Sequence, residues 1–372
     1  MLVNSNNFAP DLKRKCNVVV NTYIMVKKYI LLFLILSFNL CIHAQEESRV
    51  NWGISVVSEG QWNASNGKAG WMNMLQGDFG VELWKGSLFD ISTLSTYGVG
   101  NPVCDDRQGL SNIDADNRAF RLFHAGLSQM FLNNRLFVFM GLKAADEDYF
   151  NTDMTGLFTG SSYGGNPICT EVHGISVYPE AALAFHVAYE QGGWTLRESL
   201  YNGAPSDRLD EQFRFRPGRD GVFNIGSVMY SEENEEGFLP STYTFGYAFS
   251  SKQVGGKGQF GLWGGVEQPL CRLGEVGLNL IAQGGVPVVN DAACKGYWAG
   301  ALLAENVTEW GAQVGLSVNR CYWVDGRETD VELTLACPLG AGFSVQPAFH
   351  VIRTDGETNC VGLLRLYYEI GD

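Results

Sequence analysis

The amino-acid sequence predicts an all-β protein, a transmembrane antiparallel β-barrel of about 16 strands with short periplasmic turns and longer external loops. Three observations lead to this fold: strand-like segments of about ten residues, alternation of apolar and polar residues within them, and an uneven distribution of short and long connections. The chain also has 45 Gly, 22 Phe, 15 Tyr and 9 Trp. Abundant glycine with abundant aromatic residues is typical of short strands that turn often, and not of disorder.

The start of the chain contains a predicted export signal. The positively charged Lys27 and Lys28 precede the apolar run 29–42, and the small residue Ala44 follows. This order is that of a secretory signal peptide, which we assign to residues 25–44. The apolar run is shorter than the roughly 18–20 residues that a membrane-spanning helix needs. We therefore expect cleavage near Ala44 and export of the remainder.

The division of the chain and its charge follow from that signal. Residues 1–24 are interpreted as a leader extension or a mis-assigned start, and residues 45–372 as a single outer-membrane β-barrel domain. The whole chain has a net charge of -14, and residues 1–44 contain five Lys or Arg and one Asp, which leaves -18 on the remainder. Nucleic-acid binding needs a basic surface, so such an acidic chain is not expected to bind nucleic acid.

Candidate strands recur along the mature chain. In the first half we expect strands at 51–59, 74–84, 87–97, 119–131, 134–143, 179–189, 193–202 and 220–231. In the second half we expect them at 240–250, 258–268, 274–285, 296–304, 309–319, 328–337, 342–352 and 359–369. Each is about as long as a tilted strand that crosses a bilayer.

The connections between these segments fall into two classes. Short polar turns, such as Asn133-Asn134, 191–193 and Gly340-Ala341, join many neighbours. Three connections are long and polar, and they span 101–118, 146–178 and 202–220. Short turns at one rim and long loops at the other are typical of outer-membrane barrels.

Alternation within a strand is clearest in residues 136–143. One face carries Leu136, Val138, Met140 and Leu142, and the other carries Phe137, Phe139, Gly141 and Lys143. In a membrane barrel the apolar face meets lipid and the mixed face lines the lumen. In a soluble β-sandwich the same apolar face would pack on a second sheet, and alternation alone does not separate the two folds. The export signal, the strand lengths and the loop asymmetry favour the membrane barrel.

Short motifs spread over residues 75–369 follow one another in a characteristic order. They include Val81-Glu82-Leu83-Trp84, Ser111-Asn112-Ile113-Asp114-Ala115, Asp146-Glu147-Asp148-Tyr149-Phe150, Tyr201-Asn202-Gly203-Ala204-Pro205, and Gly261-Leu262-Trp263 with Glu267-Gln268. Each motif is short, so their number and order carry the argument. On these residues the chain resembles the OprB-type carbohydrate-selective porins.

The resemblance implies a barrel in the outer membrane of a Gram-negative-type envelope, through which small neutral saccharides diffuse without energy input. It further implies outer-membrane lipid around the barrel, no cofactor and no metal, and either a monomer or a homotrimer. The chain departs from the family in being shorter than typical members, without their extended region before the barrel, and at two particular places. It ends on Glu369-Ile370-Gly371-Asp372 instead of a terminal aromatic residue, and Phe139 stands where the family has a positive charge.

The alternation of side chains between the two faces of each strand, together with the resemblance, indicates residues that line the solute path. Lys143 lies on the face opposite the apolar one and is expected in the lumen, with a strand-end lysine that reaches solvent as the alternative. In residues 121–131, the parity implied by the family places His124 and Ser128 inward and Phe123 outward. A hydrogen-bonded structural histidine is the alternative for His124.

Further lumen candidates come from the charged and aromatic residues. Glu267 stands where the family has an acidic residue, and such a carboxylate fits a charge ring or a salt bridge to Arg121 or Arg197. Trp194 and Trp263 are candidate platforms for stacking on the face of a sugar. The alternative for each Trp is an aromatic girdle at the membrane interface.

Two long connections contain acidic residues. Asp146 and Phe150 begin the connection 146–178, which we expect to fold into the lumen and narrow it, with a solvated surface loop as the alternative. Aspartates 105, 106, 114 and 116 lie in the connection 101–118. We weighed them as a calcium site against a solvated acidic loop and favour the loop.

The mature chain has seven cysteines and no C-x-x-C spacing. Cys104 and Cys169 both lie in polar connections, which makes them candidates for a disulfide in an oxidising compartment. Cys321, Cys337 and Cys360 lie within or beside strands, where we expect small apolar packing residues.

Other classes of protein receive little support from the sequence. The motifs of nucleophilic, phosphate-binding and zinc-dependent catalysis are absent, so we expect no enzyme. The alternatives that we retain are a secreted soluble β-sandwich that binds glycans and a barrel that is non-selective or closed.

Overall fold

The computed structural model describes residues 49–372, apart from 99–101, 174, 235–237, 253–257 and 290–291. Residues 50–372 form one compact unit. The segment predicted to be a signal peptide lies outside the described residues.

The described chain contains sixteen strands, as predicted from the sequence. The first eight are β1 Val50–Asn63, β2 Ala69–Val81, β3 Ser87–Tyr97, β4 Arg118–Phe131, β5 Leu136–Lys143, β6 Ala182–Gln191, β7 Trp194–Asn202 and β8 Val222–Glu232. The others are β9 Ser241–Ser250, β10 Gln259–Leu273, β11 Val276–Pro287, β12 Cys294–Glu305, β13 Gln313–Trp323, β14 Arg327–Gly340, β15 Phe343–Thr354 and β16 Glu357–Gly371.

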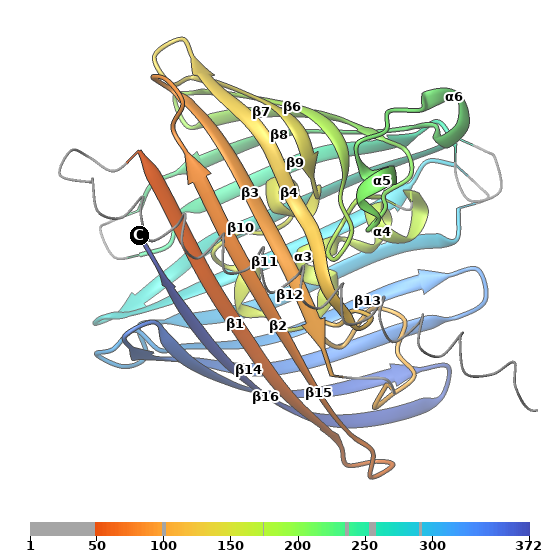
Figure 1. Ribbon diagram of the computed structural model, residues 1–372. Helices are drawn as coiled ribbons and strands as arrows, with labels where there is room; N and C mark the ends of the chain where they lie inside the picture. Colours follow the sequence, from red (N-terminus) through yellow and green to blue (C-terminus); the bar gives the residue numbers. More distant parts are fainter. Residues whose placement is uncertain (1–48, 99–101, 174, 235–237, 253–257, 290–291) are drawn as a thin grey trace, which may run out of the picture. The chain divides into compact units, whose positions relative to one another are not determined.

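These strands form one closed antiparallel sheet (Figure 1). Every strand pairs with its neighbours in the sequence, and β1 closes the ring by pairing with β16 from Gly53 opposite Gly371 to Asn63 opposite Val361. The predicted barrel is therefore confirmed, and the two packed sheets of a β-sandwich are not found in the described residues.

The positions of the strands agree with the sequence to within a few residues. One displacement of four residues is in β13, which we expected at 309–319 and which spans Gln313–Trp323. A turn precedes it, in which the N–H of Gly311 donates to the carbonyl of Thr308, and Gly311 has a positive φ of 79°. Because this turn uses residues that we had assigned to the strand, the strand begins later.

The tight turns have the residues that their backbone requires. Between β6 and β7, Gly192 and Gly193 have φ values of 59° and 81°. A two-residue hairpin with two positive φ angles matches the twist of the paired strands, and glycine adopts it without steric cost. Between β4 and β5, Asn133 and Asn134 also have positive φ values, which asparagine tolerates better than most residues.

All three long connections lie at one rim of the barrel. They join β3 to β4, β5 to β6 and β7 to β8, at the rim opposite the one where β1 begins and β16 ends. The latter is called the chain-end rim below. Hairpins such as those at Gly192-Gly193 and Gly274-Glu275 lie at the chain-end rim.

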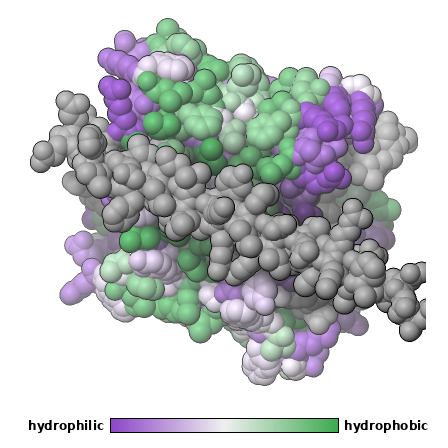
Figure 2. All heavy atoms as spheres, viewed as in Figure 1, coloured by the Kyte–Doolittle hydropathy of each residue, from purple (hydrophilic) through white to green (hydrophobic). Residues whose placement is uncertain are grey.

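The burial of side chains is reversed relative to a soluble protein. In β14, Val331 and Leu333 are 36% and 50% exposed, whereas Asp330 and Glu332 between and beside them are 5% and 0% exposed. Large exposed apolar side chains occur on every strand pair of the wall, and hydrophobic residues cover much of the visible outer face in Figure 2. Such an exterior is stable in contact with lipid and not with water.

The connections between β3 and β4 and between β5 and β6 contribute buried residues to the interior of the barrel. The connection between β5 and β6 contains α2 Asp146–Tyr149, the 3-10 helix η2 Thr155–Leu157, α3 Ser161–Gly165 and α4 Pro167–His173, and the connection between β7 and β8 contains α5 Leu209–Gln212 and α6 Pro217–Asp220. We call residues 144–181 the internal segment and residues 102–117 the second segment. Among the described residues, no helix is long and apolar enough to cross a membrane.

Because of a bulge in β4, one residue points to the side opposite the one expected from the alternation of the sequence. Phe123 was expected to point outward, but it is 5% exposed and packs edge-to-face against Tyr178 of the internal segment, with ring centroids 6.1 Å apart. In the register of β3 with β4, Ser92 faces His124 and Thr93 faces Leu122, which leaves Phe123 as an extra residue. An extra residue reverses the alternation locally.

Candidate pore constriction

The internal segment lies within the lumen, because it packs on the inner face of the wall. In β12, Tyr297, Ala299 and Leu303 are buried and form one apolar cluster with residues of the segment, including Phe158 and Ile168. The alternating residues Trp298 and Leu302 are exposed on the outer face. The segment therefore occupies part of the lumen, which is one of the two alternatives that the sequence left open for this connection.

Glycines in the wall make room for the internal segment. Helix α4 contacts β9 to β12, and a Cβ atom built on Gly261 or Gly285 would come within 2.8 Å or 2.7 Å of the side chain of Ile168. Real Cβ contacts are not that short, so this side chain occupies the space that a larger residue in β10 or β11 would need. The glycines set how closely α4 approaches the wall.

Hydrogen bonds attach the internal segment to several strands of the wall. The hydroxyl of Tyr149 contacts Ser199 Oγ at 2.8 Å and donates to the carbonyl of Ile225 at 3.0 Å. The hydroxyl of Tyr163 donates to the carbonyl of Gly300 at 3.2 Å. These bonds hold α2 against β7 and β8, and α3 against β12.

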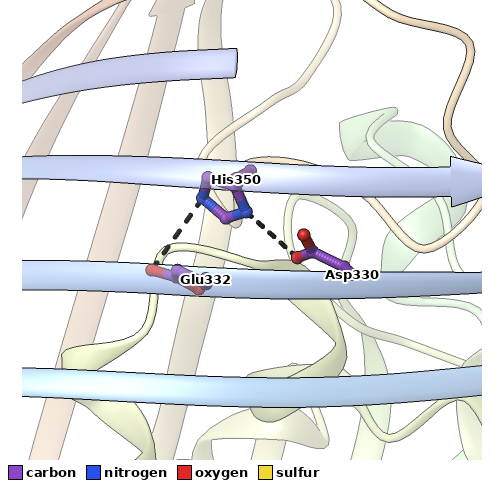
Figure 3. Close-up of side chains that lie close together, drawn as sticks. All are labelled: Asp330, Glu332 and His350. Atoms are coloured by element: carbon purple, nitrogen blue, oxygen red, sulfur yellow. Dashed lines mark hydrogen bonds and ion pairs between the residues drawn. The ribbon is translucent and has the colours of Figure 1, made fainter. Parts of the chain in front are cut away.

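A further attachment is a buried group formed by Asp330, Glu332 and His350, which we call the clasp (Figure 3). Glu332 accepts hydrogen bonds from the backbone N–H of Thr159 at 2.8 Å, from the Thr159 hydroxyl at 2.9 Å and from the N–H of Gly160 at 3.3 Å. His350 lies between the other two groups, with Nδ1 3.0 Å from Asp330 Oδ2 and Nε2 2.9 Å from Thr159 Oγ1. The clasp joins β14 and β15 to the middle of the internal segment.

The geometry of the clasp favours hydrogen bonding over a single bound metal ion. Asp330 approaches Nδ1 of His350, whereas Glu332 is nearest to Nε2, at 3.9 Å. One ion cannot bind both nitrogens of one imidazole, so the two carboxylates do not converge on one coordination site through this histidine. The oxygens of Glu332 are also used by Thr159 and Gly160.

The second segment is hydrogen-bonded to the internal segment. The N–H of Asn112 donates to the carbonyl of Thr159 at 2.8 Å, and the N–H of Ser161 donates to the carbonyl of Gly109 at 2.9 Å. Arg365 on β16 joins this pair to the wall, with a salt bridge to Glu59 at 2.7 Å and a hydrogen bond to Asn112 Oδ1 at 2.9 Å. The two segments and the wall thus form one connected hydrogen-bonded network.

Lys143 faces the lumen and forms an ion pair with the internal segment. Its Nζ is 2.6 Å from Asp148 Oδ2 and 4.9 Å from the centre of the Phe139 ring. Both Lys143 and Phe139 are buried. Arg197 donates to the carbonyl oxygen of Asp148 at 2.9 Å, so two cations of the wall converge on one aspartate at the start of the segment.

An open cavity remains beside β1 to β4, towards the chain-end rim. Its volume is about 400 Å³. Its polar lining residues are Asn51, Gln76, Asp78, Asp90, Ser92, His124, Glu147 and Asp372. His124 lies between two of the acids, with Nε2 2.8 Å from Asp90 and Nδ1 3.6 Å from Glu147. We call this space the acidic vestibule, since its charged lining carries more carboxylates than cations.

The aromatic and acidic residues near β10 are packed and leave little space. Trp263 is 5% exposed, and its ring is 4.9 Å from Phe150 and 6.2 Å from Tyr149, in both cases edge-to-face. Glu267 accepts a short hydrogen bond from the hydroxyl of Thr152. The cavity between them is about 30 Å³. The faces of Trp263 are therefore covered by the protein's own residues.

Three remaining candidates serve other purposes than those expected. Arg121 is 1% exposed and forms an ion pair with Asp116 and a hydrogen bond to Thr96 at 2.6 Å, so Glu267 is not its partner. Arg197 likewise binds Asp148 and not Glu267. Trp194 is 53% exposed and its ring lies 4.9 Å from that of Tyr230 on the outer face. It is thus a girdle residue, which corrects its assignment to the solute path.

Asp146 begins the internal segment and is buried. Burial, together with the nearby charge of Glu147, raises its pKa from 3.8 to about 7. The backbone N–H of Tyr178 donates to it at 3.4 Å, a long contact that only partly compensates for lost hydration. Asp146 is therefore half protonated near neutral pH and is placed to respond to pH.

We expect the stability of this part of the segment to decrease as pH rises. Because the folded-state pKa lies above the ordinary value, the contribution of Asp146 is fully present below about pH 4 and is lost as pH rises through about 7, by a few kcal/mol. Amide hydrogen exchange of residues 146–158, corrected for intrinsic rates, should show faster opening at pH 8 than at pH 5. Asp146→Asn should abolish the difference, and an unchanged difference would contradict this role.

The candidate residues for a disulfide and for a calcium site do not come together in the described part of the chain. Cys104 and Cys169 belong to different apolar clusters and are not bonded to each other in the structure, so the candidate disulfide between them is not found. Asp106 accepts a hydrogen bond from the N–H of Leu110, and Asp116 pairs with Arg121. Where the chain is described, the group of three His, Cys, Asp or Glu side chains close enough to share an ion is the clasp.

Sequence reasoning missed the residues that fix the constriction. Asp330 and Glu332 alternate with the apolar Val331 and Leu333 along the sequence, which is a correct signal for the lumen, but His350 and Thr159 had no such signal. Thr159 lies within a connection, where alternation gives no orientation. The contact between Thr159 and Glu332 joins positions 173 apart in the sequence.

The chain matches one family model, which is described as "Carbohydrate-selective porin, OprB family" and covers residues 76–258. No match is found among curated proteins.

Solved porin structures share the fold at low sequence identity. The high-pH structure of OprB from Pseudomonas putida has a TM-score of 0.74 and 16% identity, over 86% of this chain and 94% of that chain. An anion-selective porin from Comamonas acidovorans has a TM-score of 0.57 and 14% identity, over 87% and 100%. OmpF from Salmonella typhi, in complex with daunomycin, has a TM-score of 0.57 and 10% identity, over 86% and 97%.

Proposed function

Because the chain belongs to the OprB family of carbohydrate-selective porins, we propose that the acidic vestibule and the space beside the internal segment conduct small neutral sugars across the outer membrane. The protein is an outer-membrane porin, and diffusion through it is passive. The proposal concerns which solutes pass and which residues they meet.

The lining of the vestibule supports this choice of solute. Sugar hydroxyls both donate and accept hydrogen bonds, and the carboxylates of Asp78 and Asp90 and the amides of Asn51 and Gln76 replace hydrogen bonds to water. Gln76 already donates to Asp78 at 3.0 Å, so these groups are held in place before a solute arrives. A mouth with several carboxylates also repels anions, because low-dielectric walls reduce the screening of charge.

Lys143 and Glu267 differ in what they contribute to the path. Lys143 is paired with Asp148, so we propose that it positions the internal segment and does not contact the sugar. Glu267 and Trp263 close the region near β10. We therefore propose that the solute passes on the side of β1 to β5, where His124 and Phe139 lie 5.0 Å apart between the vestibule and Lys143.

The arrangement in the membrane is part of the same proposal. We place the chain-end rim and the vestibule in the periplasm, and the rim with the three long connections outside the cell. Lipid then surrounds the exposed apolar wall. Each chain encloses its own path, so the proposal applies equally to a monomer and to a homotrimer. The porin fold supports diffusion and in general no catalysis, and we propose no enzymatic activity.

The proposal is tested by the swelling of liposomes that contain the purified protein, with neutral monosaccharides and anionic sugar acids of the same size. We expect faster swelling with the neutral sugars. Folded, membrane-inserted protein that admits neither class would contradict the proposed function, and equal rates for both would contradict the role of the acidic vestibule.

Neutralising the vestibule should reduce its discrimination against anions. We expect Asp78→Asn with Asp90→Asn to raise the rate for anionic sugar acids relative to neutral sugars, and to lower cation selectivity in planar bilayers at low salt, because two carboxylates are removed from the lining. Asp210→Asn is a matched control, since Asp210 is exposed in the connection between β7 and β8. A change of equal size in the control would show that the vestibule is not responsible.

A further inference from the structure

Two cysteines on adjacent strands of the wall come into direct contact. Cys294 begins β12 and Cys321 lies near the end of β13, and their sulfur atoms are 3.2 Å apart. Cys294 faces Trp323 and Tyr297 faces Cys321, with a register shift between Cys294 and Gly296. This bulge turns Cys294 towards the inner face that Cys321 also occupies.

The surroundings of the two sulfurs are apolar. Both residues are 0% exposed and belong to the cluster that contains Tyr163 and Ile168 of the internal segment. In the described part of the chain, no third His, Cys, Asp or Glu joins them in a group of metal-ligating side chains. The pair is thus set apart from Cys104 and Cys169, whose thiols lie in separate clusters.

We infer that Cys294 and Cys321 are joined by a disulfide bond in the mature protein. A disulfide needs a sulfur–sulfur distance of about 2.05 Å, and rotation of the two side chains closes the remaining gap because their strands are already paired. The outer membrane is reached through an oxidising compartment, where such bonds form and persist. The inference does not depend on which solute the pore conducts.

The reaction is a thiol–disulfide exchange with a protein disulfide oxidant of that compartment. One cysteine, as its thiolate, attacks the disulfide of the oxidant and releases one thiol of the oxidant. The second cysteine then attacks this mixed disulfide, which forms the Cys294–Cys321 bond and releases the other thiol. Two electrons pass to the oxidant, and two protons leave the cysteines. Because both sulfurs are buried in the folded barrel, the exchange must take place before the internal segment covers them.

The sequence allows this bond to be read from a tryptic digest. Cleavage after Arg272, Lys295, Arg320 and Arg327 releases residues 273–295, with Cys294 as the one cysteine, and residues 321–327, with Cys321 as the one cysteine. The protein should be extracted from membranes, denatured and treated with iodoacetamide without reductant before digestion. We expect the two peptides as one linked species, lighter than their sum by two hydrogens, and as two alkylated peptides when reductant precedes alkylation.

Internal controls and a variant complete the test. The peptides that contain Cys271 and Cys337 should be alkylated with or without reductant, since these cysteines lie on β10 and β14 and are free thiols in the structure. Cys321→Ser should make residues 273–295 fully alkylatable without reductant. Alkylation of both Cys294 and Cys321 in the unreduced parent protein, or linkage of either to another cysteine, would overturn the inference. That result decides the matter even if the variant fails to insert.

Discussion

Replacing Glu332 by alanine should release the internal segment and widen the pore. The substitution leaves the N–H groups of Thr159 and Gly160 without their acceptor in a fully buried site. An unsatisfied buried donor costs about 1–3 kcal/mol, so two of them lower the free energy of unfolding by roughly 2–6 kcal/mol. We expect a larger single-channel conductance in planar bilayers, because the segment no longer rests on β14 and β15.

Two further variants determine whether the clasp is responsible. Val331→Ala changes the neighbouring residue on the lipid-facing side and should leave the conductance unchanged. Glu332→Gln keeps an acceptor but adds two donors, so we expect an intermediate effect. An unchanged conductance in Glu332→Ala, with the fold verified, would mean that other contacts, such as Tyr163 with Gly300, suffice to hold the segment.

Replacing Asp148 by alanine should destabilise the start of the segment by leaving Lys143 as an unpaired buried cation. Removing one partner of a buried ion pair typically costs about 3–5 kcal/mol, and Lys143 is 4% exposed. The lining also gains one positive charge. We therefore expect lower stability in denaturant titrations in detergent or bilayers, together with an increased permeability to anions.

A double-mutant cycle separates the pair from its surroundings. If the cost arises from the unpaired charge, Lys143→Met should restore much of the stability of Asp148→Ala, because no buried cation then remains. Additive losses in the double variant would show that Asp148 acts independently of Lys143. The carbonyl of Asp148 still accepts the hydrogen bond of Arg197 in every variant, which makes the side-chain pair the quantity that the cycle measures.

The fold was largely predictable because the sequence of a barrel strand indicates which of its faces meets lipid. A period of two residues, with the apolar set facing lipid, appears directly in the sequence, as in β14 with Val331 and Leu333. Turn residues such as Gly192-Gly193 mark where each strand ends. The alternation of the two faces did not predict every residue. The extra residue at Phe123 points inward, because the pairing of β3 with β4 is irregular there. Leu142, expected to face lipid, is fully buried in a cluster with Leu94 and Phe123, although its pairing with Ala125 and Leu183 is regular.

The site was predictable only in part, because connections have no periodicity. Lys143, His124, Asp146 and Phe150 were placed in the lumen from parity and position, and the structure has them there. Their partners could not be predicted, since Asp148 and Glu147 approach Lys143 and His124 from within the internal segment. Likewise, the residue type of Trp263 gave no sign that Phe150 and Tyr149 would cover its ring.

The pairing of β1 with β16 determines the order in which the protein can assemble. Residues more than 300 positions apart, such as Gly53 and Gly371, must meet before the ring has no free edge. Loop-closure entropy delays contacts between residues so far apart in the sequence. The last strand must therefore be synthesised before the free edge of the first strand can form its backbone hydrogen bonds. Until then two strand edges remain open to pairing with other chains. The barrel cannot therefore be completed during synthesis. Until β1 pairs with β16, the unfolded chain must be kept apart from other chains.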